Sequence, residues 1–303
     1  MDFRLTEEQR DLRAGMRELL AGRYGREALR ASVDGASAGV VDRGLWRELG
    51  AAGFFALRLP EAAGGVGLGL PEAALVFEEA GRALLSGPLV ATHLAAGTVP
   101  GAAAGEAVVT AGDLGGDLVA HLGEADGVLG APGPPWPAGP PAGEPVRSVD
   151  PLTPLHRVPP GAVPPVDAYR LEGTLLTAAL QTGSALATCE LAVRYAKERE
   201  QFGQPVGAFQ AVKHLCAEML VRAEVARTAV YAAAVTADPA ETAAAKLLAD
   251  EAAVLGARDC LQVHGGMGFT WEADVHLHLK RAWVRAEQWR TAAEAEEELA
   301  AGL

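Results

Sequence analysis

Four long segments with helix-typical sequence occupy the second half of the chain. They run from Leu171 to about Gln201, from Phe209 to Thr236, from Pro239 to His264 and from Trp271 to Ala301. Pro205, the pair Asp238-Pro239 and the pair Gly265-Gly266 separate them, and such residues begin or end helices. Short connections between long helices make neighbouring helices antiparallel. Residues 169–303 are therefore predicted to form an antiparallel four-helix bundle.

The first hundred residues also favour helices. Thr6 precedes Glu7, Glu8 and Gln9, a pattern that is typical of a helix start. Apolar residues then recur at helical spacing, at Leu5, Leu12, Met16, Leu19 and Leu20. We expect residues 1–104 to form an N-terminal helical domain.

The middle of the chain, residues 105–168, has a different composition. The segment from Gly130 to Pro145 is mostly Pro, Gly and Ala, which cannot form a helix or an inner strand and is therefore predicted to be a loop. Four short strands are expected around it, at 107–110, 118–122, 146–149 and 155–158. The fold class is thus mainly α, with a reduced β-rich middle region.

The composition narrows the classes of function. Acidic residues outnumber basic ones 39 to 26, which disfavours nucleic acid as a partner because a polyanion requires clustered Lys and Arg. No run of about 18 uncharged apolar residues occurs, and the charged amphipathic start does not resemble a signal peptide. The three cysteines stand singly, without metal-ligand or redox spacing. We expect a globular cytoplasmic protein without a membrane span.

Arg199 is the first candidate for ligand binding. It closes the first predicted bundle helix, and its planar guanidinium suits a pair of phosphates better than the point charge of a lysine. The ordinary alternative is a surface ion pair with Glu198 or Glu200.

Two further segments could complete such a site. Phe209 and Gln210 open the second bundle helix, where an aromatic ring can wall a flavin or adenine and a carboxamide can hydrogen-bond to its edge. Gln262 and the glycines after it are expected near a helix start, where backbone N–H groups can approach phosphate or ribose. A core phenylalanine and an ordinary Gly-Gly turn are the alternatives.

These segments resemble the carboxy-terminal domain of acyl-CoA dehydrogenases in their order and spacing. Further segments, Leu45 to Gly50 and Glu78 to Arg82, resemble the amino-terminal helical domain of the same family. The resemblance implies FAD held across a subunit boundary. The implied cofactor-binding residues are Arg199, Gln201, Phe202, Phe209, Gln210, Gln262, Val263, His264, Gly265, Gly266 and Thr291.

The catalytic base that the family requires is missing from both of its usual positions. Such enzymes use a carboxylate to remove the α-proton while hydride leaves the β-carbon. The resemblance places the base at Trp289 or, in branched-chain members, at Gly173. Glu172 and Glu287 are the nearby substitutes. Glu172 is one residue from position 173, so its side chain points about 100° away from that position around the helix. The Thr-Glu-Pro segment and the later Trp-containing strand of the family's β domain are also absent.

No metal site is predicted. His276 and His278 are two residues apart, so they face different sides of a helix, and His214 is expected to be a packing residue.

The chain is therefore interpreted as a base-lacking subunit that completes the FAD site of a homologous complete subunit, in a two-plus-two heterotetramer. The reaction would be α,β-desaturation of a sterol-derived or branched acyl-CoA, with an electron-transfer flavoprotein as a candidate acceptor. A self-sufficient homo-oligomer with Glu172 or Glu287 as base, and a non-catalytic scaffold or regulatory subunit, are the alternatives.

Overall fold

The computed structural model describes residues 4–34, 39–130 and 141–302. The N-terminal part is helical, as predicted. Thr6 caps the first helix: its Oγ1 accepts from the Gln9 backbone N–H at 3.2 Å, and its own N–H donates to Gln9 Oε1 at 3.1 Å. The helices are α1 (Glu7–Arg23), α2 (Arg26–Asp34), α3 (Arg43–Ala51), α4 (Leu70–Arg82) and α5 (Leu89–Ala95), with a 3₁₀ turn, η1 (Glu61–Ala63).

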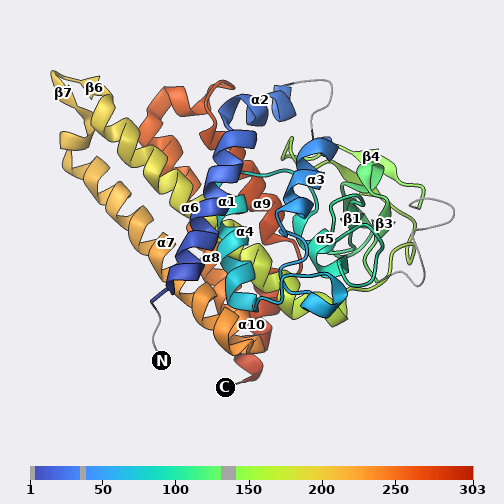
Figure 1. The fold of residues 1–303 in the computed structure, drawn as a ribbon. Coiled ribbons are helices and arrows are strands. Elements are labelled where there is room, and N and C mark those ends of the chain that lie inside the picture. Colours follow the sequence, from blue (N-terminus) through green and yellow to red (C-terminus); the bar gives the residue numbers. More distant parts are fainter. Residues whose placement is uncertain (1–3, 35–38, 131–140, 303) are drawn as a thin grey trace.

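The middle region contains two small sheets, which lie apart from the long helices in Figure 1. Strands β1 (Val109–Thr110) and β3 (Gly127–Val128) pair in parallel. An antiparallel sheet has the order β2 (Leu118–Ala120), β5 (Leu155–Arg157) and β4 (Glu144–Val146). Two 3₁₀ turns, η2 (Leu122–Glu124) and η3 (Asp167–Tyr169), complete the region.

The predicted Pro/Gly loop extends less far than expected. Residues 131–140 of that segment lie outside the described residues, but Glu144 and Pro145 at its end belong to strand β4. A proline is compatible with this strand because β4 lies at the edge of its sheet, where one backbone N–H is not needed for pairing.

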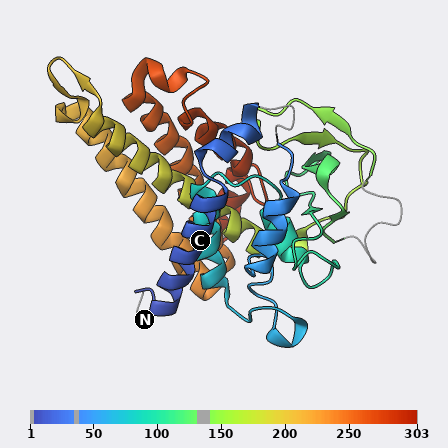
Figure 2. The same cartoon turned by 45° about the horizontal axis from the view of Figure 1, so that its top comes forward.

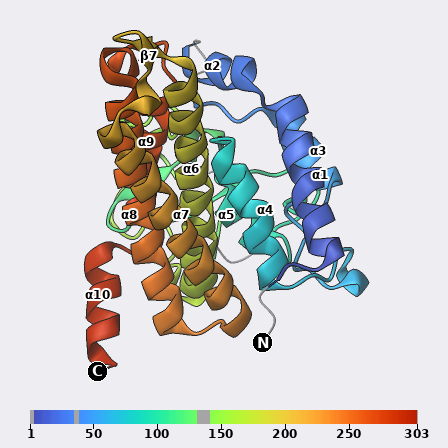
Figure 3. The same ribbon diagram turned by 90° about the vertical axis from the view of Figure 1, so that its left-hand side faces the viewer.

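Three of the four long bundle segments form single helices: α6 (Arg170–Glu198), α7 (Gln210–Thr236) and α8 (Pro239–His264). The prediction of one helix from 271 to 301 was wrong, because the chain forms two, α9 (Val275–Ala286) and α10 (Ala292–Ala301). Trp289 interrupts them with a left-handed φ of 64°, and Thr291 then caps α10. In Figure 3, α6 to α9 run side by side and α10 extends below them.

Helix α6 also ends earlier than predicted, at Glu198 instead of Gln201. Two short strands follow, β6 (Glu200–Gln201) and β7 (Gln204–Pro205), and they form a hairpin. Phe202 and Gly203 turn this hairpin with φ values of 54° and 77°, a conformation that matches the twist of a two-residue hairpin loop. The 3₁₀ turns η4 (Val206–Ala208) and η5 (Gly265–Phe269) follow β7 and α8.

Helices α4 and α6 cross at backbone distance. A Cβ added to Gly81 would lie 2.0 Å from the carbonyl oxygen of Leu180, and one added to Gly183 would lie 1.9 Å from that of Glu78. Both positions therefore require glycine. This crossing joins the N-terminal helices to the bundle.

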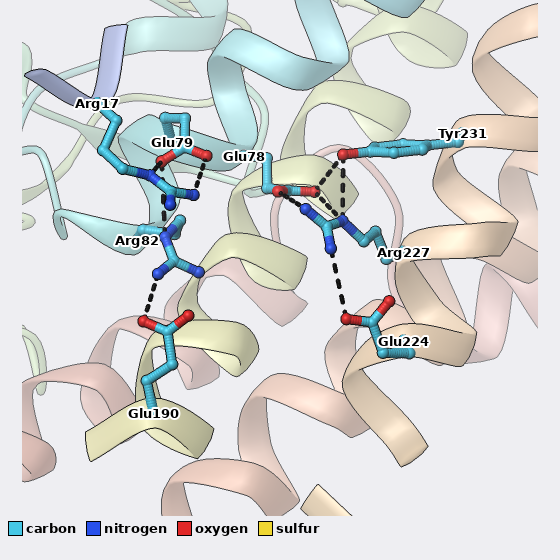
Figure 4. A network of polar contacts seen from close by, with 8 residues as sticks. All are labelled: Arg17, Glu78, Glu79, Arg82, Glu190, Glu224, Arg227 and Tyr231. Atoms are coloured by element: carbon cyan, nitrogen blue, oxygen red, sulfur yellow. Dashed lines mark hydrogen bonds and ion pairs between the residues drawn. The ribbon is translucent and has the colours of Figure 1, made fainter. Parts of the chain in front are cut away.

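Two buried carboxylates on α4 reinforce the joint (Figure 4). The side chains of Glu78 and Glu79 are each 1% exposed. Glu79 accepts from Arg17 on α1 at 2.6 Å, whereas Glu78 accepts from Arg227 at 2.9 Å and from the Tyr231 hydroxyl at 2.8 Å, both on α7. Buried charges require such partners, so this network ties α1 and α7 to the same helix. Within the described ranges, no helix combines the length and apolarity needed to cross a lipid bilayer.

Candidate functional site

One end of the bundle collects most of the residues that sequence reasoning singled out. Tyr195 near the end of α6 stacks on His264 at the end of α8, with ring centroids 4.1 Å apart. Phe202 in the hairpin meets Phe209 edge-on at 6.1 Å. The β6–β7 hairpin, the start of α7 and the end of α8 therefore lie together, and the hairpin projects beyond the helices in Figure 2. We call this region the open end.

Arg199 is exposed at the open end. Its backbone is extended and fixed by two hydrogen bonds, to the Tyr195 carbonyl at 2.8 Å and from the Val206 N–H at 2.7 Å. Its guanidinium has no ion pair or hydrogen bond with any residue that the structure describes, so the alternative pairing with Glu198 or Glu200 is not formed. An exposed guanidinium without a partner in the described chain, carried on a hydrogen-bonded backbone, is suited to an external anion.

The glycines of the open end leave free space beside the backbone. A Cβ added to Gly203, Gly265 or Gly266 would meet nothing within 4 Å, and Gly265 has a φ of 60°. The expectation of a helix start here was wrong, because Gly265 instead ends α8 and opens the short 3₁₀ turn η5. The space that these glycines leave is compatible with close approach of a ligand to the main chain.

The remaining predicted residues of the open end differ in accessibility. Gln201 and Gln262 are exposed. Gln210 is exposed and its Nε2 lies 2.9 Å from His214 Nε2. Val263, however, is buried within the bundle core, so only its backbone can face a ligand.

Thr291 does not belong to this cluster. It caps α10, accepting from the Glu294 N–H at 3.3 Å. Figure 1 shows α10 far from the β6–β7 hairpin, at the other end of the long helices. The Glu294 carboxylate in turn accepts from Arg170, at the start of α6, at 2.9 Å.

The two positions where the resemblance places a base lie directly against each other. A Cβ on Gly173 would be 2.1 Å from Cε3 of Trp289, so the indole fills the space beside this glycine. Trp289 is 3% exposed, and its backbone N–H donates to the Asp113 carbonyl at 2.6 Å. The chain therefore has no carboxylate at either position, and no space for one at Gly173. We call this region the closed end.

A small cavity of about 30 Å³ remains at the closed end, lined in part by Thr110, Asp113, Gln288 and Trp289. That volume is sufficient for one or two water-sized groups and far too small for an acyl chain. Burial raises the pKa of Asp113 to about 7, and the hydrogen bond from Gln288 Nε2 at 2.9 Å partly offsets this rise.

Neither substitute carboxylate reaches this cavity. Glu172 forms an ion pair with Arg58 and lines a different hollow of about 340 Å³, together with His93 and Tyr169. Glu287 is exposed at the end of α9.

The two neighbouring histidines have separate partners. The His276 ring stacks on Trp271 with centroids 5.0 Å apart, and His278 Nδ1 lies 2.7 Å from Ser184 Oγ. The side chains point to different sides of α9, as their spacing predicts.

Sequence reasoning missed Asp113, Gln288 and the hairpin turn at Phe202. The adjacent Phe202-Gly203 pair within an otherwise polar stretch was a usable signal for a turn. No local pattern connected Asp113 with Gln288, because 175 residues separate them in the chain.

Large apolar side chains are exposed around the open end and along α7. Phe202, Phe269 and Met267 are 89%, 75% and 56% exposed. Leu220, Val221, Val225 and Val235 on α7 are each about half exposed or more, between 48% and 62%. Apolar surface of this extent is typical of a protein interface.

Comparison with known proteins identifies the family. Residues 6–109 match the acyl-CoA dehydrogenase N-terminal domain, and residues 171–290 match the C-terminal domain. The chain is 36% identical over 301 residues to "Acyl-CoA dehydrogenase IpdE2" of Mycobacterium tuberculosis, covering 93% of this chain and 92% of that protein.

Solved structures agree with this family. A chain of the ChsE4-ChsE5 complex from Mycobacterium tuberculosis superposes with a TM-score of 0.84 at 23% identity, covering 99% of this chain and 98% of that one. A chain of "Tcur3481-Tcur3483 steroid ACAD G363A variant" gives a TM-score of 0.83 at 26% identity, with 97% of each chain covered. The mainly helical fold predicted from the sequence is confirmed, and this chain belongs to the acyl-CoA dehydrogenase family.

Proposed function

We propose that this chain is the base-lacking subunit of a heteromeric acyl-CoA dehydrogenase, in which it completes the FAD site of a homologous, catalytically complete partner. The contact between Trp289 and Gly173 is the observation that carries this proposal. Neither residue carries a carboxylate, and the indole of Trp289 fills the space beside Gly173. A chain that retained its own reaction would need an accessible carboxylate and an acyl pocket at this end.

The residues of the open end fit a phosphate-containing cofactor. Arg199 provides an unpaired guanidinium, and Gly265 and Gly266 leave the main chain accessible. Phe202 and Phe209 provide aromatic faces beside it. Arg199 would bind the pyrophosphate, and the exposed carboxamides of Gln201 and Gln262 would orient the adenosine by hydrogen bonds.

FAD bound in the partner's site would accept the hydride from the β-carbon of the acyl group. This chain would contribute affinity and orientation at the far end of the cofactor, and the partner's carboxylate would remove the α-proton. Two subunits of each kind would give the two-plus-two arrangement. Related bundles can pack with pseudo-symmetry, so one site can be lost while the interface persists.

The partner and substrate are proposed from the relatives and the surface. One structural neighbour is a chain of the ChsE4-ChsE5 complex, and another is described as a steroid ACAD variant. The exposed apolar residues of α7 offer a surface on which a homologous bundle could pack. We propose a steroid-derived or branched acyl-CoA as the substrate.

Flavin absorbance tests the proposal. The chain is purified alone and after co-expression with a homologue, encoded nearby, that retains the base glutamate. We expect FAD only in the co-purified complex. Arg199→Ala should lower the affinity of the complex for FAD about 10- to 100-fold, because it removes a hydrogen-bonded ion pair with the pyrophosphate. Arg194→Ala, an exposed arginine on the same helix, is the matched control and should retain FAD.

The alternatives predict other outcomes. FAD bound near one per chain in the protein purified alone would favour the self-sufficient enzyme, and Glu172→Gln would then abolish turnover. Assembly with the partner but with no dependence of FAD on Arg199 would favour a scaffold.

A further inference from the structure

Two arginines of helix α9 face the cavity at the closed end. Arg281 and Arg285 are each 3% exposed and line it together with Thr110, His121, Thr177 and Gln288. Arginine remains protonated at neutral pH even where burial lowers its pKa, as it does for Arg285. The cavity is therefore surrounded by two buried positive charges.

Only one of these charges has a carboxylate partner within the described part of the chain. Arg281 Nε donates to Asp150, and its Nη1 donates to the Leu85 carbonyl at 3.2 Å. Its Nη2 is buried and has no partner among those residues. Arg285 has one long hydrogen bond, from Nη1 to the Leu180 carbonyl at 3.4 Å, and no ion pair with any residue of the described ranges.

The other titratable groups nearby do not supply the missing negative charge. Burial, together with the adjacent arginines, lowers the pKa of His278 to about 3, and burial lowers that of His121 to about 3, so both are neutral at pH 7. Asp113 lines the same cavity, but burial raises its pKa to about 7, so it is only partly ionised at neutral pH, and its carboxylate accepts from Gln288 and forms no ion pair with either arginine in the described ranges. Asp250 is already paired with Lys246 at 2.5 Å.

A buried charge without compensation is costly, so the cavity requires a counter-ion. We propose that the cavity between Arg281 and Arg285 binds one small monovalent anion, with chloride as the occupant. Its volume of about 30 Å³ is enough for chloride and a water molecule, whereas sulfate, phosphate and a CoA ester are too large. The anion would accept from the free Nη2 of Arg281 and from the Arg285 guanidinium, and Thr177 also lines the cavity.

Crystals of the co-purified complex grown in sodium bromide test the site directly. We expect an anomalous bromide peak within hydrogen-bonding distance of both guanidiniums, and none in crystals grown in sodium gluconate. A cavity that holds only water in bromide, or an Asp113 carboxylate turned onto Arg285, would overturn the proposal.

Thermal unfolding gives a second test in solution. At constant ionic strength, replacing gluconate by chloride should raise the Tm by about 2 °C per tenfold increase in chloride, since an anion that binds only the folded state stabilises it. Arg285→Met should abolish this dependence, and Arg194→Met, a substitution of an exposed arginine, should retain it. An equal dependence in Arg285→Met and wild type would refute the site. Should Arg285→Met not fold, the bromide peak decides.

Discussion

The two ends of helix α6 differ in how closely their side chains are packed. At the closed end, Gly173 packs against an indole, and only a cavity of about 30 Å³ remains. At the open end, Arg199 has no partner within the described chain, and Phe202 is 89% exposed. Packing of this quality stabilises a fold by itself, whereas unpaired groups and exposed rings add nothing to the isolated chain. The comparison separates the packed contact between Gly173 and Trp289, which serves folding, from the exposed residues of the open end, which the isolated chain does not need.

The largest expected effect is on stability at the closed end. Trp289→Ala should lower the free energy of unfolding by about 3–5 kcal/mol, because it removes a buried indole and leaves a cavity against Gly173. Urea denaturation measures the change. Trp283→Ala is the control, since that indole is 39% exposed and its loss should cost much less. Equal losses in both variants would mean that the closed end is not a packed core.

The pH dependence of stability tests whether the Asp113 carboxyl is buried. Its pKa is raised to about 7 in the folded protein, so its contribution to stability is complete below pH 4 and disappears as the pH rises through 7. Asp113→Asn cannot titrate. The stability of the variant relative to wild type should therefore increase by about 3 kcal/mol between pH 5 and pH 8. Parallel pH profiles would show that the carboxylate is solvated.

Gly173→Ala examines the same contact from the other side. The new methyl group overlaps Trp289, so a loss of about 1–3 kcal/mol is expected. The loss should shrink in a Trp289→Ala background, because the two sites share one contact. Gly15→Ala in α1 is the matched control: its Cβ would meet nothing within 4 Å, and it should stabilise the helix by about 0.5–1 kcal/mol. A Gly173→Ala protein as stable as wild type would contradict the observed packing.

The smallest effect on stability is expected at the open end. Phe202→Ser should change the free energy of unfolding by less than about 0.5 kcal/mol, since the ring is almost fully exposed. In the co-purified complex, the same substitution should reduce retained flavin or partner. Comparison of unfolding curves with the absorbance of the complex separates the two effects. A large loss of stability with unchanged flavin content would show that Phe202 stabilises the fold and does not contact the cofactor or the partner.

Sequence reasoning succeeded where the physical signal is local. The capping pattern at Thr6 predicted the start of α1, and the helical spacing predicted three long bundle helices. The pair Asp238-Pro239 marked a helix start, because Asp238 accepts from the Glu241 N–H at 2.9 Å and proline fits the first turn. The order and spacing of the Arg199 and Gln262 segments indicated the family, since both segments can be read directly from the amino-acid sequence.

It failed where distant residues decide the conformation. Nothing near Trp289 predicts its left-handed φ, which is fixed by the hydrogen bond to Asp113 and by contact with Gly173. The same applies to Arg281 and Arg285, which are charged residues at buried helix positions and whose surroundings come from α5, α6 and the β region. Their partners, such as Asp150, lie more than a hundred residues away in the chain.

Helix α6 connects the two ends as one uninterrupted rod from Arg170 to Glu198. At a rise of 1.5 Å per residue, Gly173 and Arg199 are separated by about 39 Å. Substitutions more than about 10 Å apart that share no partner have additive effects on stability. Substitutions could therefore accumulate around Gly173 during evolution without changing the stability or the structure around Arg199. If the open end binds a partner's cofactor as proposed, a gene duplicate without catalytic activity would retain that end only for as long as the partner depended on it.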